Sequence, residues 1–311
     1  MIFSKIKNIK QTIRNVWCKG DIRYQSTQKP APGAVMLSHN TLEPRSLTEP
    51  LGPPLLILHG LMGSKQNWRQ ISKQIHNGMN HARKIILLDN RNHGMSPRTT
   101  HHSQKLMVED VYQMIRILQL NKPVLLGHSL GGSTMMFLAL LYPELVSGLI
   151  VVEISPRTHI LPQRLMHQIL PILKNSKLEA TEKNLQKVKR RVYEELASKI
   201  KDKPTLDFLM QNLYKDDDGK IKWRLNLETL GQSKVEKFPH KAFQLQYPGP
   251  CLFLGGQRSE FLKESDLPDI RKMFPRAEMQ ILQSASHLLL VENPKEFVNV
   301  ITQFLNETLS N

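Results

Sequence analysis

The chain has 311 residues, of which 40% are hydrophobic and 23% are charged, the balance of a globular protein with a sizeable core. No apolar run approaches the roughly 20 residues needed to cross a bilayer, and the two cysteines, Cys18 and Cys251, exclude a disulfide framework. The formal net charge of +16 raises nucleic acid as a possible partner.

Residues 1–24 combine a basic face with an apolar face. Six basic residues stand against a single acid, Asp21. The apolar residues recur at helical spacing: Ile2, Phe3, Ile6, Ile9, Ile13, Val16 and Trp17. This pattern predicts a mitochondrial transit peptide, removed near residues 23–26, and hence a mitochondrial location. A basic helix that binds a membrane surface or a partner protein is the alternative.

Much of the remaining positive charge lies in residues 157–247, which hold 19 basic and 11 acidic residues. Aromatic residues do not alternate with the basic ones, as base stacking would require, so we expect no nucleic-acid partner. A solvated helical surface is the simplest explanation of this excess. Attraction of an anionic substrate, such as a coenzyme A ester, is the alternative.

The first half of the chain alternates strand and helix patterns. Residues 25–53 are rich in Pro, Ser and Thr and predict a linker with weak edge strands near 34–42. Further elements are predicted at 55–58 (strand), 67–77 (helix), 84–88 (strand) and 104–120 (amphipathic helix). This alternation predicts a mostly parallel sheet with helices on both faces. In the loop at 89–96, Asp89 and Arg91 are expected to form hydrogen bonds and His93 to be structural.

A short apolar run at 124–126 leads into Gly127-His128-Ser129-Leu130-Gly131, and an apolar helical pattern follows. Strand, sharp turn and helix form the context of a nucleophile elbow, which exposes a serine hydroxyl above the end of a sheet. The following helix directs its first N–H groups to the point where an oxyanion forms. Ser129 is therefore the predicted nucleophile, and a glycine-rich turn without catalytic function is the alternative.

The second half contains a long interruption of the alternation. An apolar strand at 149–156 carries one carboxylate, Glu153, and residues 157–247 are then lysine-rich and mostly helical by pattern, with a turn at 216–219. We predict that this insert forms a lid over the carboxyl end of the sheet. The later elements are predicted at 250–256 (strand), 267–274 (helix), 278–282 (strand) and from 294 onward (helix).

A serine hydroxyl needs a base, and the base needs a carboxylate to fix its tautomer. His287 follows the last predicted strand, so the order along the chain is serine, acid, histidine, as in the α/β-hydrolase fold. Glu153 is the favoured acid, and Glu260, in the loop after the lid, is the alternative. The backbone N–H groups of Leu61 and Leu130 are the predicted oxyanion-hole donors.

Several motifs occur together in one order: HGLMGS (59–64), DNRNHGMSP (89–97), GHSLGG (127–132), VVEISP (151–156), WRLNL (223–227) and FPRAEMQ (274–280). Together they resemble the mitochondrial α/β-hydrolases that include ethanol acetyltransferases and related α/β-hydrolase-domain serine esterases. The resemblance covers residues 33–306. It implies an acid on the strand at 149–156, which agrees with Glu153, although the family usually has aspartate there. The family also usually has glycine directly before the histidine, where this chain has Ser286.

The resemblance implies acetyl transfer from acetyl-coenzyme A to ethanol, with ester and thioester hydrolysis as side reactions. We therefore expect a domain over 25–311 that uses an acyl donor and an alcohol or water as acceptor, with no resident cofactor, no metal and no transmembrane segment. A plain esterase or thioesterase is the first alternative. The second is a non-catalytic protein whose basic lid binds a partner enzyme.

Overall fold

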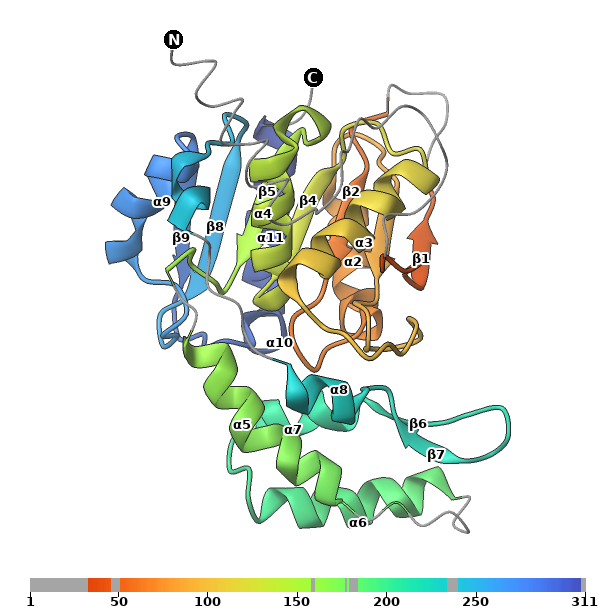
Figure 1. The fold of residues 1–311 in the computed structure, drawn as a ribbon. Coiled ribbons are helices and arrows are strands. Elements are labelled where there is room, and N and C mark those ends of the chain that lie inside the picture. The colour runs from red at the N-terminus through yellow and green to blue at the C-terminus, as the bar shows by residue number, and fades with distance from the viewer. Residues whose placement is uncertain are drawn as a thin grey trace.

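The computed structural model describes residues 33–45, 51–157, 160–176, 178, 184–233 and 240–308. The predicted transit peptide at 1–24 lies outside the described residues. Figure 1 shows a sheet between two layers of helices, with a separate group of helices below it. In spatial order the seven strands of the sheet are β1 (His39–Leu42), β3 (Ile85–Leu88), β2 (Leu55–Leu58), β4 (Val124–His128), β5 (Gly148–Val152), β8 (Cys251–Gly256) and β9 (Ala277–Leu282).

Only the edge strand β1 is antiparallel to its neighbour, and the other strand pairs in this sheet are parallel. On one face α2 (Arg69–Gly78) packs against α11 (Pro294–Thr308), and on the other α3 (Gln104–Ile117) packs against α4 (Leu130–Leu141), with α9 (Leu267–Met273) beside them. The short α10 (Leu289–Glu292) leads into α11. The fold is thus the predicted α/β-hydrolase architecture.

The central strands are apolar on both faces because both faces are covered. Leu55 and Ile57 of β2 belong to the core under α2 and α11, whereas Leu56 and Leu58 belong to the core under α3 and α4. Helix α4 lies in the centre of its layer, and ten of its residues are buried. This explains why its sequence lacks a polar face.

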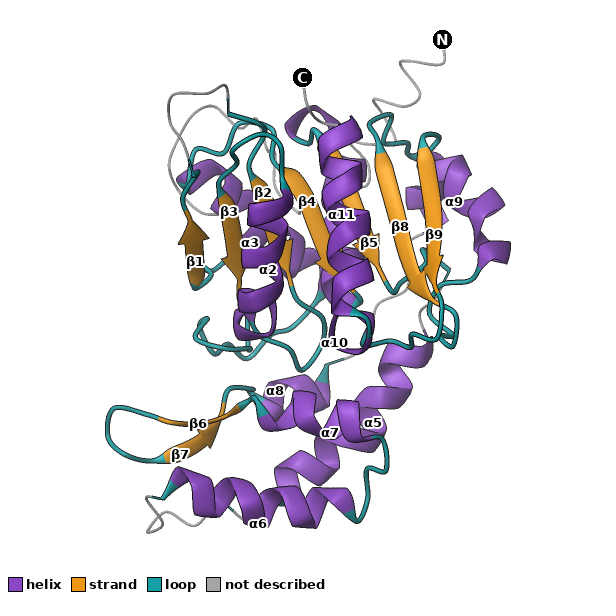
Figure 2. Ribbon diagram, turned by 180° about the vertical axis from the view of Figure 1, so that it is seen from behind, coloured by secondary structure: helices purple, strands orange, loops and turns teal. Residues whose placement is uncertain are grey.

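The segment between β5 and β8 forms the group of elements below the sheet, at the carboxyl ends of its parallel strands (Figure 2). Its elements are α5 (Ile160–Asn175), α6 (Leu185–Ala197), α7 (Lys203–Met210), the hairpin strands β6 (Leu213–Lys215) and β7 (Ile221–Trp223), and α8 (Leu227–Gln232). We call this segment the lid. Its apolar core includes Leu170, Val192, Leu206 and Leu209, and Met62 from the loop after β2 packs in the same cluster.

Short 3₁₀ helices also occur in the described residues: η1 (Lys65–Trp68), η2 (Pro143–Leu145), η3 (His240–Gln244) and η4 (Glu264–Asp266). No helix in the described part of the chain is long and apolar enough to span a bilayer.

The structure corrects three details of the predicted elements. The strand predicted at 149–156 ends at Val152. Glu153 has a positive φ of 60°, in the left-handed region, and a β-strand cannot continue through that conformation. The edge strands predicted near 34–42 reduce to β1. The lid contains the β6–β7 hairpin around the predicted turn, where the N–H of Gly219 donates to the carbonyl of Asp216 (3.0 Å).

Candidate active site

Ser129 lies at the sharp turn between β4 and α4. Its backbone has φ of 52° and ψ of −116°, a strained conformation that holds the side chain out from the end of the sheet. A Cβ at Gly127 would lie 2.4 Å from the Gly131 carbonyl oxygen, and one at Gly131 would lie 2.4 Å from the Leu58 carbonyl oxygen. Both positions therefore require glycine, which is why the turn has this spacing of small residues.

The turn is fixed to the neighbouring strand. The N–H of Ser129 donates to the carbonyl of Val152 at 2.7 Å, and the N–H of Glu153 donates to the carbonyl of Leu254 at 2.9 Å. Parallel pairing thus brings the ends of β4, β5 and β8 together, and with them the first two residues of the predicted site.

His287 reaches the same place from the loop after β9. Its Nδ1 lies 3.2 Å from Oε2 of Glu153, and its ring stacks on Phe261 with centroids 3.9 Å apart. A carboxylate only accepts, so Nδ1 carries the proton and Nε2 is left as the basic nitrogen. Burial lowers the pKa of His287 to about 4, which keeps the ring neutral at pH 7.

Glu153 is completely buried and has three partners. Besides His287, its carboxylate accepts hydrogen bonds from the backbone N–H of Gly256 and from the hydroxyl of Ser259. Burial raises the pKa of Glu153 to about 7, whereas the bonds from Ser259 and Gly256 lower it. These two donors favour the charged carboxylate in a place that would otherwise favour the neutral acid.

Glu260, the alternative acid, lies on the surface of the loop after β8. Its neighbour Ser259 is buried instead. The structure thus brings Ser129, Glu153 and His287 to one place and leaves Glu260 outside it. The role of Ser259 was not predicted from the sequence.

The loop that carries His287 is held by a second, partly buried carboxylate, Glu292. Ser286 donates its N–H (2.5 Å) and its hydroxyl (2.9 Å) to Glu292 in α10. In addition, Nε2 of His128 donates to the backbone carbonyl of His287 at 2.9 Å. Ser286 therefore forms a specific contact in this chain, and the sequence did not indicate that Glu292 would be its partner.

The loop after β2 forms the opposite side of the site. The N–H of Met62 donates to Nε2 of His93 (3.1 Å), so His93 has the structural role expected of it. Asp89 accepts from the N–H of Lys65 (2.7 Å) and from its Nζ (2.6 Å), and Arg91 pairs with Asp110. These bonds fix the loop that contains Leu61. Leu130 is the first residue of α4, where helix N–H groups have no partner within the helix.

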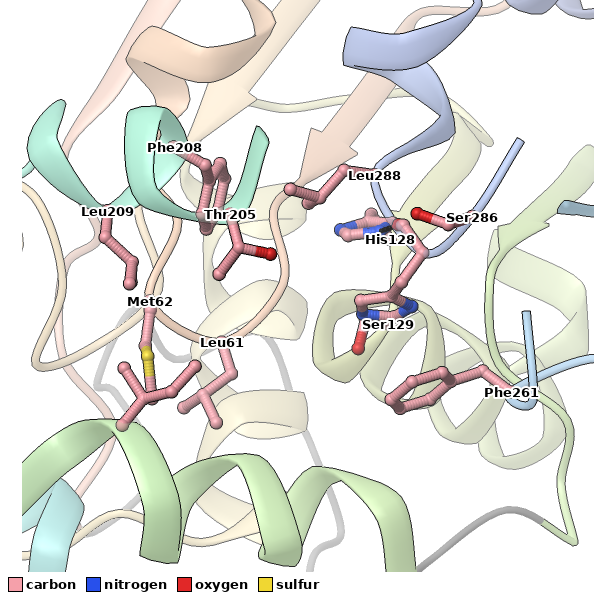
Figure 3. A pocket seen from close by; sticks show the side chains of 12 residues that line it. Leu61, Met62, His128, Ser129, Thr205, Phe208, Leu209, Phe261, Ser286 and Leu288 are labelled. Atoms are coloured by element: carbon pink, nitrogen blue, oxygen red, sulfur yellow. Dashed lines mark hydrogen bonds between the residues drawn. The ribbon is translucent and has the colours of Figure 1, made fainter. Parts of the chain in front are cut away.

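A cavity of about 140 Å³ lies between these loops and the lid. Ser129 and Phe261 lie on one side of it, and Met62, Phe208 and Leu209 lie on the other (Figure 3). Its wall is formed by Leu61, Met62, His128, Ser129, Ile169, Thr205, Phe208, Leu209, Phe261, Ser286, His287 and Leu288. The nucleophile and the base therefore face a small, largely apolar space. Among the described residues, no cluster of three or more His, Cys, Asp or Glu could hold a metal ion.

Comparison with known proteins agrees with this architecture. A family model of the alpha/beta hydrolase fold matches residues 53–294. Over 256 residues the chain is 37% identical to the sn-1-specific diacylglycerol lipase ABHD11 of Xenopus laevis, covering 82% of this chain and 80% of that one.

Two further proteins are informative. Ethanol acetyltransferase 1 of Cyberlindnera jadinii is 27% identical over 288 residues, which cover 84% of this chain and 82% of that one. A solved marine microorganism esterase has a TM-score of 0.74 at 28% identity, covering 88% of this chain and 100% of that one. These relatives include an ABHD11 lipase and an ethanol acetyltransferase, and the motifs resemble both kinds of protein. The lipase is more similar in sequence to this chain than the acetyltransferase is. The chain therefore belongs to the α/β-hydrolase family.

Proposed function

We propose that the chain is a serine carboxylester hydrolase in which Ser129 is the nucleophile, His287 the base and Glu153 the acid. The observation that carries the proposal is the contact of His287 Nδ1 with the buried Glu153 carboxylate. This contact leaves Nε2 of the ring as the proton acceptor, in the same cavity as the Ser129 side chain.

The reaction proceeds in two halves. His287 Nε2 takes the proton of the Ser129 hydroxyl while the oxygen attacks the ester carbonyl, and the N–H groups of Leu61 and Leu130 bind the resulting oxyanion. The imidazolium then protonates the departing alkoxide, which leaves as the alcohol and yields acyl-Ser129. Water attacks this ester with His287 again as base, and collapse of the second intermediate releases the acid and restores the serine.

Acyl transfer to ethanol from acetyl-coenzyme A is the second candidate. The similarity to the Cyberlindnera ethanol acetyltransferase favours it, as do the small size of the cavity and the excess of basic residues in the lid. The chemistry up to acetyl-Ser129 is the same, and only the acceptor differs. In this case acetyl-coenzyme A is a substrate and no resident cofactor is needed.

One experiment separates the two. The purified chain is incubated with acetyl-coenzyme A or with phenyl acetate, with and without ethanol, and free acetate and ethyl acetate are measured. A hydrolase produces acetate in every case, whereas a transferase shifts the product to ethyl acetate as ethanol is added. Ser129→Ala should produce neither product, and turnover in that variant would contradict both candidates.

The predicted mitochondrial location remains a proposal as well. It rests on the basic, amphipathic composition of residues 1–24. A fluorescent protein fused behind these residues should enter mitochondria, and the chain without them should not. Import of the truncated chain would contradict the assignment.

A further inference from the structure

Residues of the lid line the end of the cavity opposite Ser129. Helix α7 contributes Phe208 and Leu209 to this end wall, and Met62 from the core lies beside them (Figure 3). Leu209 is 1% exposed and belongs to the apolar core of the lid, so it cannot swing out of the way without opening that core.

The end wall is also tied to the core of the protein. Directly after α7, the buried side-chain amide of Asn212 donates to the carbonyl of Met62 at 2.6 Å. This bond joins the lid part of the end wall to its core part. Because the N–H of Met62 donates to Nε2 of His93, these contacts extend to the loop after β3.

The next part of the lid is held in the same way. Arg98 donates to the carbonyls of Trp223 (2.7 Å) and Leu225 (3.2 Å). Asn226 donates its N–H to the backbone carbonyl of Asn92 at 2.9 Å, and Thr229 donates its hydroxyl to the backbone carbonyl of Thr99 at 2.8 Å. The part of the lid from α7 to α8 therefore has a fixed position over the sheet.

A fixed wall limits how far the cavity can extend at this end. Its volume of about 140 Å³ is similar to that of an engineered apolar cavity that holds benzene, a molecule of six carbons. Resting on the proposed function, we infer that the enzyme is selective for esters with compact acyl groups of up to about six carbons, and that Phe208 and Leu209 set this limit. Esters of long fatty acids are outside this substrate class.

The test is a series of p-nitrophenyl esters with acyl groups from acetate to dodecanoate, each below its micellar concentration, with the full chain. We expect kcat/KM to hold up to the hexanoate and to fall at least about tenfold by the decanoate, since an overfilled pocket loses binding in the transition state. Dodecanoate hydrolysis as fast as that of butyrate would overturn the inference.

Leu209→Ala removes three carbons from the end wall and should move the length limit toward longer acyl groups. Leu206→Ala is the matched control, because Leu206 is equally buried in the same helix and lid core but does not line the cavity. It should lower stability to a similar extent and leave the chain-length profile unchanged. A shift of the profile in both variants, or in neither, would contradict the assignment of the wall.

Phe208→Ala provides a second variant at a less buried position, in case Leu209→Ala does not fold. It too should extend the accepted chain length. Labelling with a fluorophosphonate keeps the two proposals distinguishable. If Ser129 is labelled and all esters are cleaved alike, only the size limit fails; if Ser129 is not labelled and no ester is cleaved, the proposed function fails.

Discussion

Ser259 donates its hydroxyl to the same oxygen of Glu153 that lies 3.2 Å from His287 Nδ1. One carboxylate oxygen therefore bridges the base and a second donor. Ser259, in the loop after β8, thus supplies a hydrogen bond to an acid that directly follows β5. The contact stabilises the charge of Glu153 in a buried place.

Ser259→Ala should weaken catalysis by raising the pKa of Glu153 further, since the lost hydrogen bond favours the charged form. The acid limb of kcat/KM in the native chain should lie near pH 7, because Glu153 has to be ionised to stabilise the imidazolium. In the variant this limb should move to higher pH. Ser265→Ala, at an exposed serine in η4, is the control. An unchanged pH profile in Ser259→Ala would contradict this role.

Glu153→Gln should lower kcat by up to about 10⁴, as the equivalent change does in serine proteases. Glu260→Gln should have little effect, because that carboxylate is on the surface. A severe loss in Glu260→Gln with a mild one in Glu153→Gln would reverse the assignment of the acid.

The same Glu153→Gln variant should be more stable than the native chain above pH 7. The pKa of Glu153 is raised from 4.5 to about 7 in the folded state, so the folded state binds more protons and stability falls as the pH rises through this window. Removing the charge should regain up to about 3 kcal/mol at pH 8 and less at pH 5. Thermal unfolding at both pH values measures this. A variant that is less stable than the native chain at pH 8 would contradict burial as the dominant cause.

Glu153→Asp tests the fit of the longer side chain. Aspartate adopts the left-handed conformation at this position more readily than glutamate does. However, the shorter side chain withdraws the carboxylate from His287, Ser259 and Gly256 together. We expect a loss of about a hundredfold in kcat/KM, the scale of a 1 Å misplacement. Full activity would show that the backbone adjusts to either acid.

Glu292→Ala should lower kcat by about tenfold, because the loop before the base loses both bonds from Ser286. Ser286→Gly removes only the hydroxyl contact and should keep most of the activity, since the backbone N–H still reaches Glu292. The two variants are compared by kcat with a short-chain ester. A larger loss in Ser286→Gly than in Glu292→Ala would contradict this account.

The sequence was sufficient for the features that depend on local pattern. The apolar quartet at 55–58, the glycines around Ser129 and the alternation of strands and helices predicted the sheet and the elbow. The contact of Ser259 with Glu153 joins residues 106 positions apart, and no local pattern indicates it. The β6–β7 hairpin was missed because its strands have only three residues each, too few to show a period. The size of the cavity depends on how α7 packs on the core, which composition does not reveal.

The central claim is that Ser129 forms a covalent acyl intermediate. The most direct measurement is to treat the full chain with a fluorophosphonate, digest it and map the adduct by mass spectrometry, with residual esterase activity measured in parallel. The account predicts a single adduct on Ser129, loss of activity in proportion to labelling, and no adduct in Ser129→Ala. An adduct on another residue, or full activity in a chain labelled completely at Ser129, would contradict it.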